Sequence, residues 1–181
     1  MARESNPKFS PDGKSLTFTN DRSRTNQLYL VNLPWTNLEQ KTFHSEGCSL
    51  EQWCSDGRLI ISGKRDHFWK NAQRLFFIQE RSNSQEDLIF DAHSECGKLS
   101  PNGKSILFQR DGSAWWRKGY KASKAGKIWH YLIEKGSFKM LVDETTDCRS
   151  RIWHPNNIHF YYISSKSGSP NLWKKNLING N

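Results

Sequence analysis

Long apolar segments are missing from this 181-residue sequence. No run approaches the roughly 20 apolar residues that a membrane-spanning helix requires, and residues 1–7 lack the apolar core of a signal peptide. We therefore expect no membrane as a partner and, for the sequence as it stands, a cytoplasmic location. A signal peptide lost upstream would make the periplasm the expected compartment.

Cysteine is also scarce. The four residues of this type are Cys48, Cys54, Cys96 and Cys148. None belongs to a Cys-x-x-Cys pair, which argues against a structural zinc site and against a thioredoxin-type dithiol. The sequence thus predicts reduced thiols, no metal site and no cofactor. Cys48 and Cys148 each lie five residues before a tryptophan, so we interpret them as small residues that enter an inner strand.

Recognisable catalytic motifs are the third absence. The sequence has no Gly-x-Ser-x-Gly nucleophile elbow. A short His-Ser-Glu segment occurs twice, beginning at His44 and at His93. We interpret both histidines as groups that close a turn through hydrogen bonds, because each precedes a predicted hairpin by a similar distance. We therefore predict no catalytic residue in this chain.

Aromatic residues, by contrast, are abundant for so polar a chain. They make up 13% of the residues, with eight tryptophans, at a mean hydropathy of −0.83. Burial must then come from a few large side chains on short elements, which favours strands over long amphipathic helices. The net charge of +9 is compatible with nucleic acid or another acidic partner but does not identify one.

A ten-residue segment is repeated along the chain. Residues 9–18, FSPDGKSLTF, return as residues 99–108, LSPNGKSILF, and weaker copies lie between and after them. The successive turns are 44, 46 and 54 residues apart, at Asp12, Asp56, Asn102 and Asn156. Periods of about 40–50 residues are typical of propeller blades. Asp-Gly, Asn-Gly and Asn-Asn favour positive φ angles, so each copy predicts a tight two-residue hairpin.

Short alternating apolar runs follow each predicted hairpin, as at residues 16–18 and again at residues 28–31. Short strands separated by polar turns are expected to form antiparallel meanders. We predict an all-β fold of about four four-stranded antiparallel meanders, which are the blades of an incomplete β-propeller. The predicted blades cover residues 1–41, 42–88, 89–143 and 144–181 of a single propeller segment, and the last blade lacks its outer strand.

The repeat, an aromatic residue followed by Ser-Pro-Asp-Gly-Lys and later by Gln-Leu-Tyr or Asn-Leu-Trp, resembles the propeller repeats of the Tol-Pal propeller protein and of tricorn-type serine peptidases. An Arg-Lys-Gly-Tyr insertion at residues 117–120 precedes an Ile-Trp strand, which is similar to the amino-terminal propeller of tricorn-like peptidases. The resemblance covers nearly the whole chain. It implies propellers that guide peptide substrates or products beside a separate catalytic region carrying a nucleophilic serine.

The insertion is rich in basic residues. Between residues 117 and 127 there are five basic residues and no acidic one, next to aromatic residues. This combination suits a phosphate backbone with stacked bases, or a peptide carboxylate, and it also occurs in ordinary solvated loops. No nucleic-acid-binding module accompanies the charge, which disfavours nucleic acid. The candidate peptide-binding residues are Arg117, Lys118, Tyr120, Lys121 and Lys124.

Two functional hypotheses follow. The first is a non-catalytic β-propeller segment of a tricorn-like serine peptidase, which guides or binds peptide substrates or products. Its expected partners are a peptide or protein, together with a peptidase region or further blades that are missing from this chain. The alternative is a protein-interaction propeller of the Tol-Pal type in an envelope complex.

Overall fold

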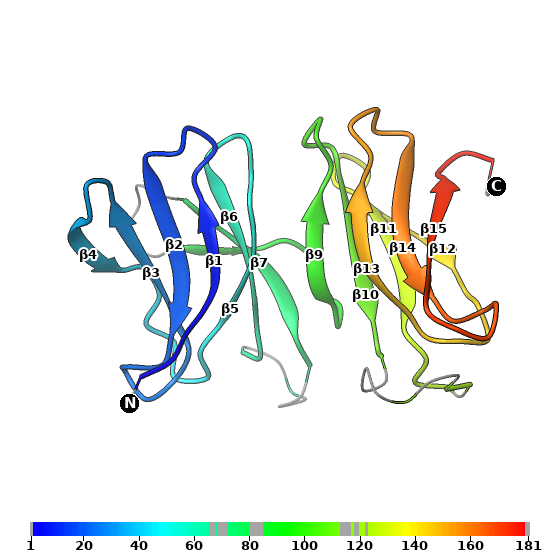
Figure 1. Ribbon diagram of the computed structural model, residues 1–181, viewed down its shortest axis with the longest axis horizontal. Helices are drawn as coiled ribbons and strands as arrows, with labels where there is room; N and C mark the ends of the chain where they lie inside the picture. Colours follow the sequence, from blue (N-terminus) through cyan, green and yellow to red (C-terminus); the bar gives the residue numbers. More distant parts are fainter. Residues whose placement is uncertain are drawn as a thin grey trace. The chain divides into compact units, whose positions relative to one another are not determined.

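The computed structural model describes residues 2–65, 68, 72–79, 85–112, 117, 120–121 and 123–179. Within these residues all regular secondary structure is β, in four antiparallel sheets whose strand order follows the chain (Figure 1). Each sheet is therefore a meander, the simplest connection for antiparallel strands. The predicted all-β fold of blade-like meanders is confirmed.

The strands of the first two sheets occupy the amino-terminal half. The first sheet contains β1 (Glu4–Phe9), β2 (Ser15–Asn20), β3 (Gln27–Asn32) and β4 (Thr36–Gln40). The second contains β5 (Ser49–Trp53), β6 (Arg58–Gly63), β7 (Arg74–Gln79) and β8 (Glu86–Leu88).

The other two sheets occupy the carboxy-terminal half. The third contains β9 (Glu95–Leu99), β10 (Ser105–Arg110), β11 (Lys127–Leu132) and β12 (Ser137–Val142). The fourth contains β13 (Cys148–Trp153), β14 (His159–Ser164) and β15 (Asn171–Asn176), so its described part has three strands.

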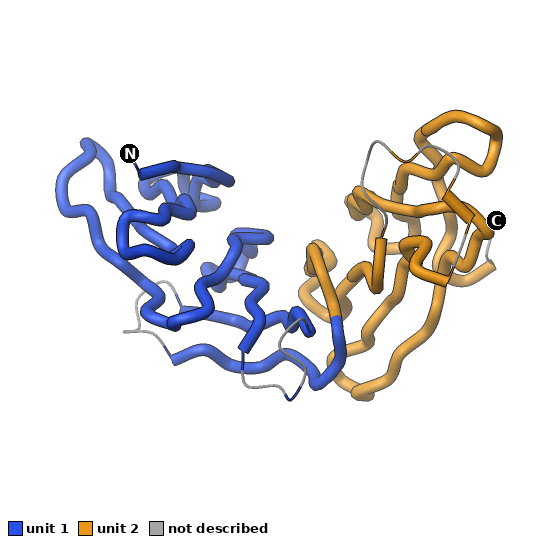
Figure 2. The backbone as a smooth tube through the Cα atoms, turned by 90° about the horizontal axis from the view of Figure 1, so that it is seen from below, with its two compact units in different colours: residues 1–93 blue, residues 94–181 orange. Residues whose placement is uncertain are grey.

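Two compact units divide the chain, residues 1–93 and residues 94–181 (Figure 2). Each unit consists of two successive sheets and has its own apolar core. In the first unit the core includes Leu28 and Leu30 of β3 with Ile61 and Phe76 of the second sheet. The assignment of blades within a complete propeller stays a prediction.

The core of the second unit is built in the same way, from both of its sheets. It contains Leu107, Ile128, Val142, Cys148, Trp153, Phe160 and Tyr162. Cys148 begins β13 and is fully buried, and Cys48, directly before β5, is 5% exposed. Both cysteines are thus buried small residues at the start of a strand, and their assignment to the innermost strand of a blade stays a prediction.

The repeated hairpins are wider than predicted. Ser10 N–H donates to the carbonyl of Ser15 (2.8 Å), which leaves four residues in the loop. Positive φ occurs at Gly13 (71°) but not at Asp12, whose carboxylate accepts hydrogen bonds from Lys14 N–H (3.0 Å) and the Ser10 hydroxyl (2.6 Å). The two-residue hairpin was therefore wrong, because proline at the second position and a capping aspartate favour an ordinary β-turn.

The histidines of the two His-Ser-Glu segments accept hydrogen bonds from different parts of the chain. His44 Nδ1 accepts a hydrogen bond from Glu46 N–H at 3.1 Å and so closes its own turn, as expected. His93 Nδ1 accepts one from the backbone N–H of Gln73, also at 3.1 Å. His93 therefore anchors the start of β7.

A buried arginine joins the two sheets of the second unit. Arg151 is 2% exposed and lies on β13. Its guanidinium donates to the carbonyls of Glu95 (3.1 Å) and Cys96 at β9, and to Gln109 Oε1 on β10 (2.8 Å). These bonds fix the position of β13 against the third sheet.

Candidate functional site

Four of the five predicted peptide-binding residues belong to the described part of the chain, and Lys118 lies outside it. Arg117, Lys121 and Lys124 are exposed, and Tyr120 is partly buried. The Cζ atom of Arg117 lies 4.8 Å from the centre of the Tyr120 ring. A guanidinium held over an aromatic ring keeps its hydrogen-bond donors directed to solvent, where they can bind a carboxylate.

The backbone anchors the end of this loop. Gly112 N–H, just after β10, donates to the carbonyl of Lys124 at 3.1 Å. Lys124, three residues before β11, is thereby held near the end of β10. Their role in peptide binding stays a prediction.

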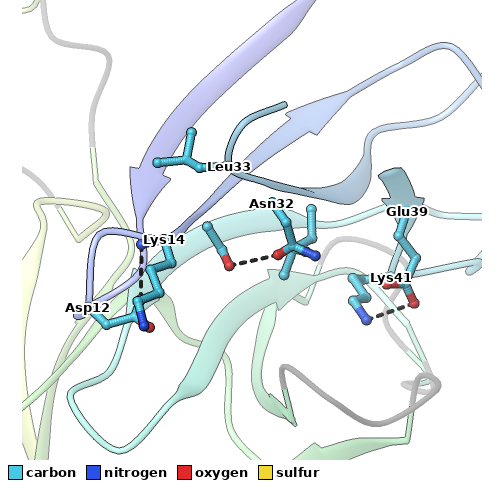
Figure 3. A pocket seen from close by; sticks show the side chains of 8 residues that line it. Asp12, Lys14, Asn32, Leu33, Glu39 and Lys41 are labelled. Atoms are coloured by element: carbon cyan, nitrogen blue, oxygen red, sulfur yellow. Dashed lines mark hydrogen bonds and ion pairs between the residues drawn. The ribbon is translucent and has the colours of Figure 1, made fainter. Parts of the chain in front are cut away.

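A polar pocket on the first sheet was missed by the sequence interpretation. It has a volume of about 560 Å³ and is lined by Asp12, Lys14, Ser15, Leu30, Asn32, Leu33, Glu39 and Lys41. Figure 3 shows Asp12 and Lys14 at one side of the pocket and Glu39 and Lys41 at the other. Two cationic and two anionic side chains therefore share one opening.

The charges of this pocket are held in place by specific contacts. Lys41 Nζ lies 2.7 Å from Glu39 Oε1, with the lysine side chain only 6% exposed. Hydrogen bonds from the Ser10 hydroxyl and from Lys14 N–H hold the pKa of Asp12 below its usual range. Such a mixed pocket suits a dipolar group, as a peptide segment offers. The Ser-Pro-Asp-Gly-Lys repeat supplies one side of this pocket, with Asp12 and Lys14. Nothing in the neighbouring sequence indicates that this hairpin lies beside β4.

In the second unit, hydroxyl and amino side chains form a hydrogen-bond network around Glu144. Its carboxylate accepts hydrogen bonds from the Tyr162 hydroxyl (2.7 Å), Lys166 Nζ (2.8 Å) and the Ser164 hydroxyl. Burial and the Glu144 hydrogen bond raise the pKa of Tyr162 to about 12, and burial raises that of Cys148 to about 12. Both groups are therefore protonated at neutral pH, which is not the state of an activated nucleophile.

The Glu144 network predicts a specific pH dependence of stability. Partial burial opposes ionisation of Glu144, but hydrogen bonds from Lys166, Ser164 and Tyr162 outweigh it and lower the pKa of the carboxyl. The resulting stabilisation is present above the pKa of glutamate in the unfolded chain and is lost as pH falls through the lower folded pKa. Urea unfolding at a series of acidic pH values should show a shallower pH dependence for Glu144→Gln than for the unaltered chain.

The matched control for this series is Glu134→Gln, which removes an exposed carboxylate from the same unit. Its pH dependence should match that of the unaltered chain. Equal slopes for all three proteins would show that Glu144 is not perturbed in the folded state.

Among the described residues no group of three or more His, Cys, Asp or Glu side chains is placed to hold a metal ion. The same part of the chain contains no helix long and apolar enough to cross a membrane.

The architecture and the sequence together match one protein family. The family model for the tricorn protease N-terminal beta propeller domain matches residues 1–181. The chain belongs to this family. The predicted resemblance to the amino-terminal propeller of tricorn-like peptidases is thereby confirmed, and the chain is a tricorn-type propeller domain. No match was found among curated protein sequences.

Solved structures show the same fold. The tricorn protease structure matches with a TM-score of 0.77 and 21% identity over 98% of this chain and 18% of that one. TolB from Acinetobacter baumannii matches with a TM-score of 0.75 and 20% identity, over 97% of this chain and 41% of that one. TolB from Agrobacterium tumefaciens matches with a TM-score of 0.74 and 15% identity, over 97% and 62%. The tricorn-type domain therefore spans less than two thirds of each of these proteins.

Proposed function

We propose that this tricorn-type propeller domain is a non-catalytic part of a serine peptidase and that it binds or guides peptide substrates or products. The observation that carries the proposal is the family match over residues 1–181. The exposed Arg117, stacked on the partly buried Tyr120, with Lys121 and Lys124 nearby in the sequence, supplies groups suited to a peptide carboxylate. The Tol-Pal alternative rests on likeness of fold alone, at 20% and 15% identity.

Charge reversal of the loop tests this proposal. Fluorescence anisotropy would measure the binding of short labelled peptides with a free C-terminal carboxylate to the unaltered chain and to the triple variant Arg117→Glu, Lys121→Glu, Lys124→Glu. Loss of several charge-assisted hydrogen bonds should weaken binding at least about tenfold. Peptides with an amidated C-terminus should lose most of this difference.

A second triple variant controls for net charge. Lys135→Glu, Lys139→Glu and Lys174→Glu reverse three exposed lysines of the same unit and change the net charge by the same amount. Binding should remain close to that of the unaltered chain. An equal loss in both triple variants would indicate non-specific attraction by the basic chain and would contradict a peptide site in the loop.

A further inference from the structure

Lys41 is a buried cation in the wall of the polar pocket on the first sheet. It directly follows β4, and its side chain is 6% exposed. The ammonium group has three hydrogens to donate, but its one hydrogen bond to a described residue is the bond to Glu39 Oε1, at 2.7 Å. Buried donors on a charged group are rarely left without acceptors, so the remaining hydrogens call for oxygen atoms inside the pocket.

Asn32, the last residue of β3, supplies a second donor to the same pocket. The Ser15 hydroxyl donates to Asn32 Oδ1 at 2.8 Å, which leaves the amide nitrogen for another partner. Among the described residues Nδ2 of Asn32 has none. Figure 3 shows Asn32 between the hairpin residues on one side of the pocket and the pair of Glu39 and Lys41 on the other. An amide and an ammonium group are therefore both available to an anionic group in this pocket.

The pocket also offers a carboxylate beside these donors. Glu39 lies two residues before Lys41 on extended chain, so both side chains point to one face of the sheet. Oε1 of Glu39 pairs with Lys41, whereas Oε2 has no partner among the described residues, and the side chain is 48% exposed. The second acid, Asp12, is already occupied in its own turn by the Ser10 hydroxyl and Lys14 N–H.

The closeness of the two opposite charges restricts the kind of ligand. A simple anion at Lys41 would meet the negative charge of Glu39, but a ligand that also carries a cation would place that cation beside Glu39. The volume of about 560 Å³ is in the range of small-molecule sites. Leu30 and the 40% exposed Leu33 add apolar atoms to the wall, where a short side chain of the ligand can pack.

We propose that this pocket binds a free α-amino acid in its zwitterionic form. The carboxylate of the ligand accepts hydrogen bonds from Lys41 Nζ and Asn32 Nδ2, its ammonium group donates to Glu39, and its side chain contacts Leu33. Both charges of an amino acid are attached to one carbon, which matches the adjacent opposite charges of the protein. The site lies on the first sheet and uses none of the residues of the basic loop, so it stands or falls independently of the proposed function.

Isothermal titration calorimetry with L-leucine on the 181-residue chain tests the site. Leucine should bind saturably. The analogue 4-methylpentanoate lacks the ammonium group and leucinamide lacks the carboxylate, so each should bind at least about tenfold more weakly. N-acetyl-leucinamide has the amide groups of a peptide segment but neither charge, and the same loss is expected. No saturable binding of leucine, or any analogue that binds as tightly as leucine, would overturn the proposal.

Two variants locate the site. Glu39→Gln and Lys41→Met should each weaken leucine binding at least about tenfold. The matched controls Glu134→Gln and Lys135→Met remove exposed charges of the other unit and should leave it unchanged. Glu39→Gln keeps an oxygen atom for Lys41, so it decides if Lys41→Met does not fold. Unchanged leucine affinity in a folded Glu39→Gln would refute the assignment to this pocket.

The analogues also distinguish direct contact from a change in the shape of the pocket. Glu39→Gln should not weaken the binding of 4-methylpentanoate, because this compound has no ammonium group for the carboxylate to accept from. Lys41→Met should likewise not weaken the binding of leucinamide. If Glu39→Gln weakens leucine and 4-methylpentanoate by the same factor, Glu39 does not contact the ammonium group and the proposed orientation of the ligand is wrong.

Discussion

Replacing Arg151 with methionine should lower the free energy of unfolding of the second unit by about 3 kcal/mol or more. Arg151 is 2% exposed and donates hydrogen bonds to two backbone carbonyls at β9 and to Gln109 on β10. Methionine fills a similar volume but leaves these acceptors, of which Gln109 is buried, without their donor. Urea unfolding followed by tryptophan fluorescence would measure the change, because Trp153 belongs to the same core.

Lys135→Met is the control for this substitution. Lys135 is exposed in the turn after β11, so the same loss of charge and the same new side chain should change stability by no more than about 0.5 kcal/mol. A loss for Arg151→Met as small as that of the control would mean that the arginine contributes nothing beyond its packing.

Gly126→Ala should destabilise the same unit by about 1–3 kcal/mol, because the added methyl group would clash with neighbouring atoms rather than because a contact is lost. A Cβ atom at residue 126 would lie 2.6 Å from the backbone carbonyl oxygen of Cys148 and 2.9 Å from both Asp147 Oδ1 and Gln109 Nε2. The carbonyl belongs to the first residue of β13 and cannot rotate away. Gly126 itself is tied there, because its N–H donates to Asp147 Oδ1 (2.6 Å) and its carbonyl accepts from Cys148 N–H (3.0 Å).

The same substitution at Gly63 is a matched comparison for stability. A Cβ atom there would meet the end of the Arg65 side chain at 3.2 Å and the carbonyl of Gly47 at 3.3 Å, distances that small shifts relieve. Thermal unfolding of both variants should therefore show a larger loss for Gly126→Ala. Equal losses would indicate that glycine at residue 126 matters for its backbone freedom and not for the close approach of β13.

Local features of the fold could be predicted because each depends on neighbouring residues. The Ser-Pro-Asp-Gly-Lys repeat marks a chain reversal by its own chemistry, and alternating apolar residues mark the strands that follow it. The detail of the reversal was wrong at Asp12, where the side chain closes the turn and Gly13 alone takes a positive φ. That outcome depends on hydrogen bonds among Ser10, Asp12 and Lys14, which the Asp-Gly pair alone does not reveal.

The candidate sites also differ in whether their residues are neighbours in the sequence. The basic loop was found from the sequence because its residues are consecutive, whereas the pocket at Lys41 combines β4 with a hairpin more than 20 residues earlier. Nothing local distinguishes Arg65 from the other arginines. Its two unpaired donors become evident only in the tertiary structure, where Glu86 pairs with Nη1 while Nε and Nη2 are buried without a partner among the described residues.

The sequence by itself determined the all-β meanders, their repeat and the family, because turns and strand alternation depend on residues that are contiguous in the sequence. Only the tertiary structure decided which buried charged groups have hydrogen-bond partners. Arg151 finds its acceptors at residues 95, 96 and 109, whereas two donors of Arg65 find none among the described residues. The physical reason is that sheet stacking brings together side chains distant in sequence, and a buried polar group is stabilised or destabilised by those neighbours alone.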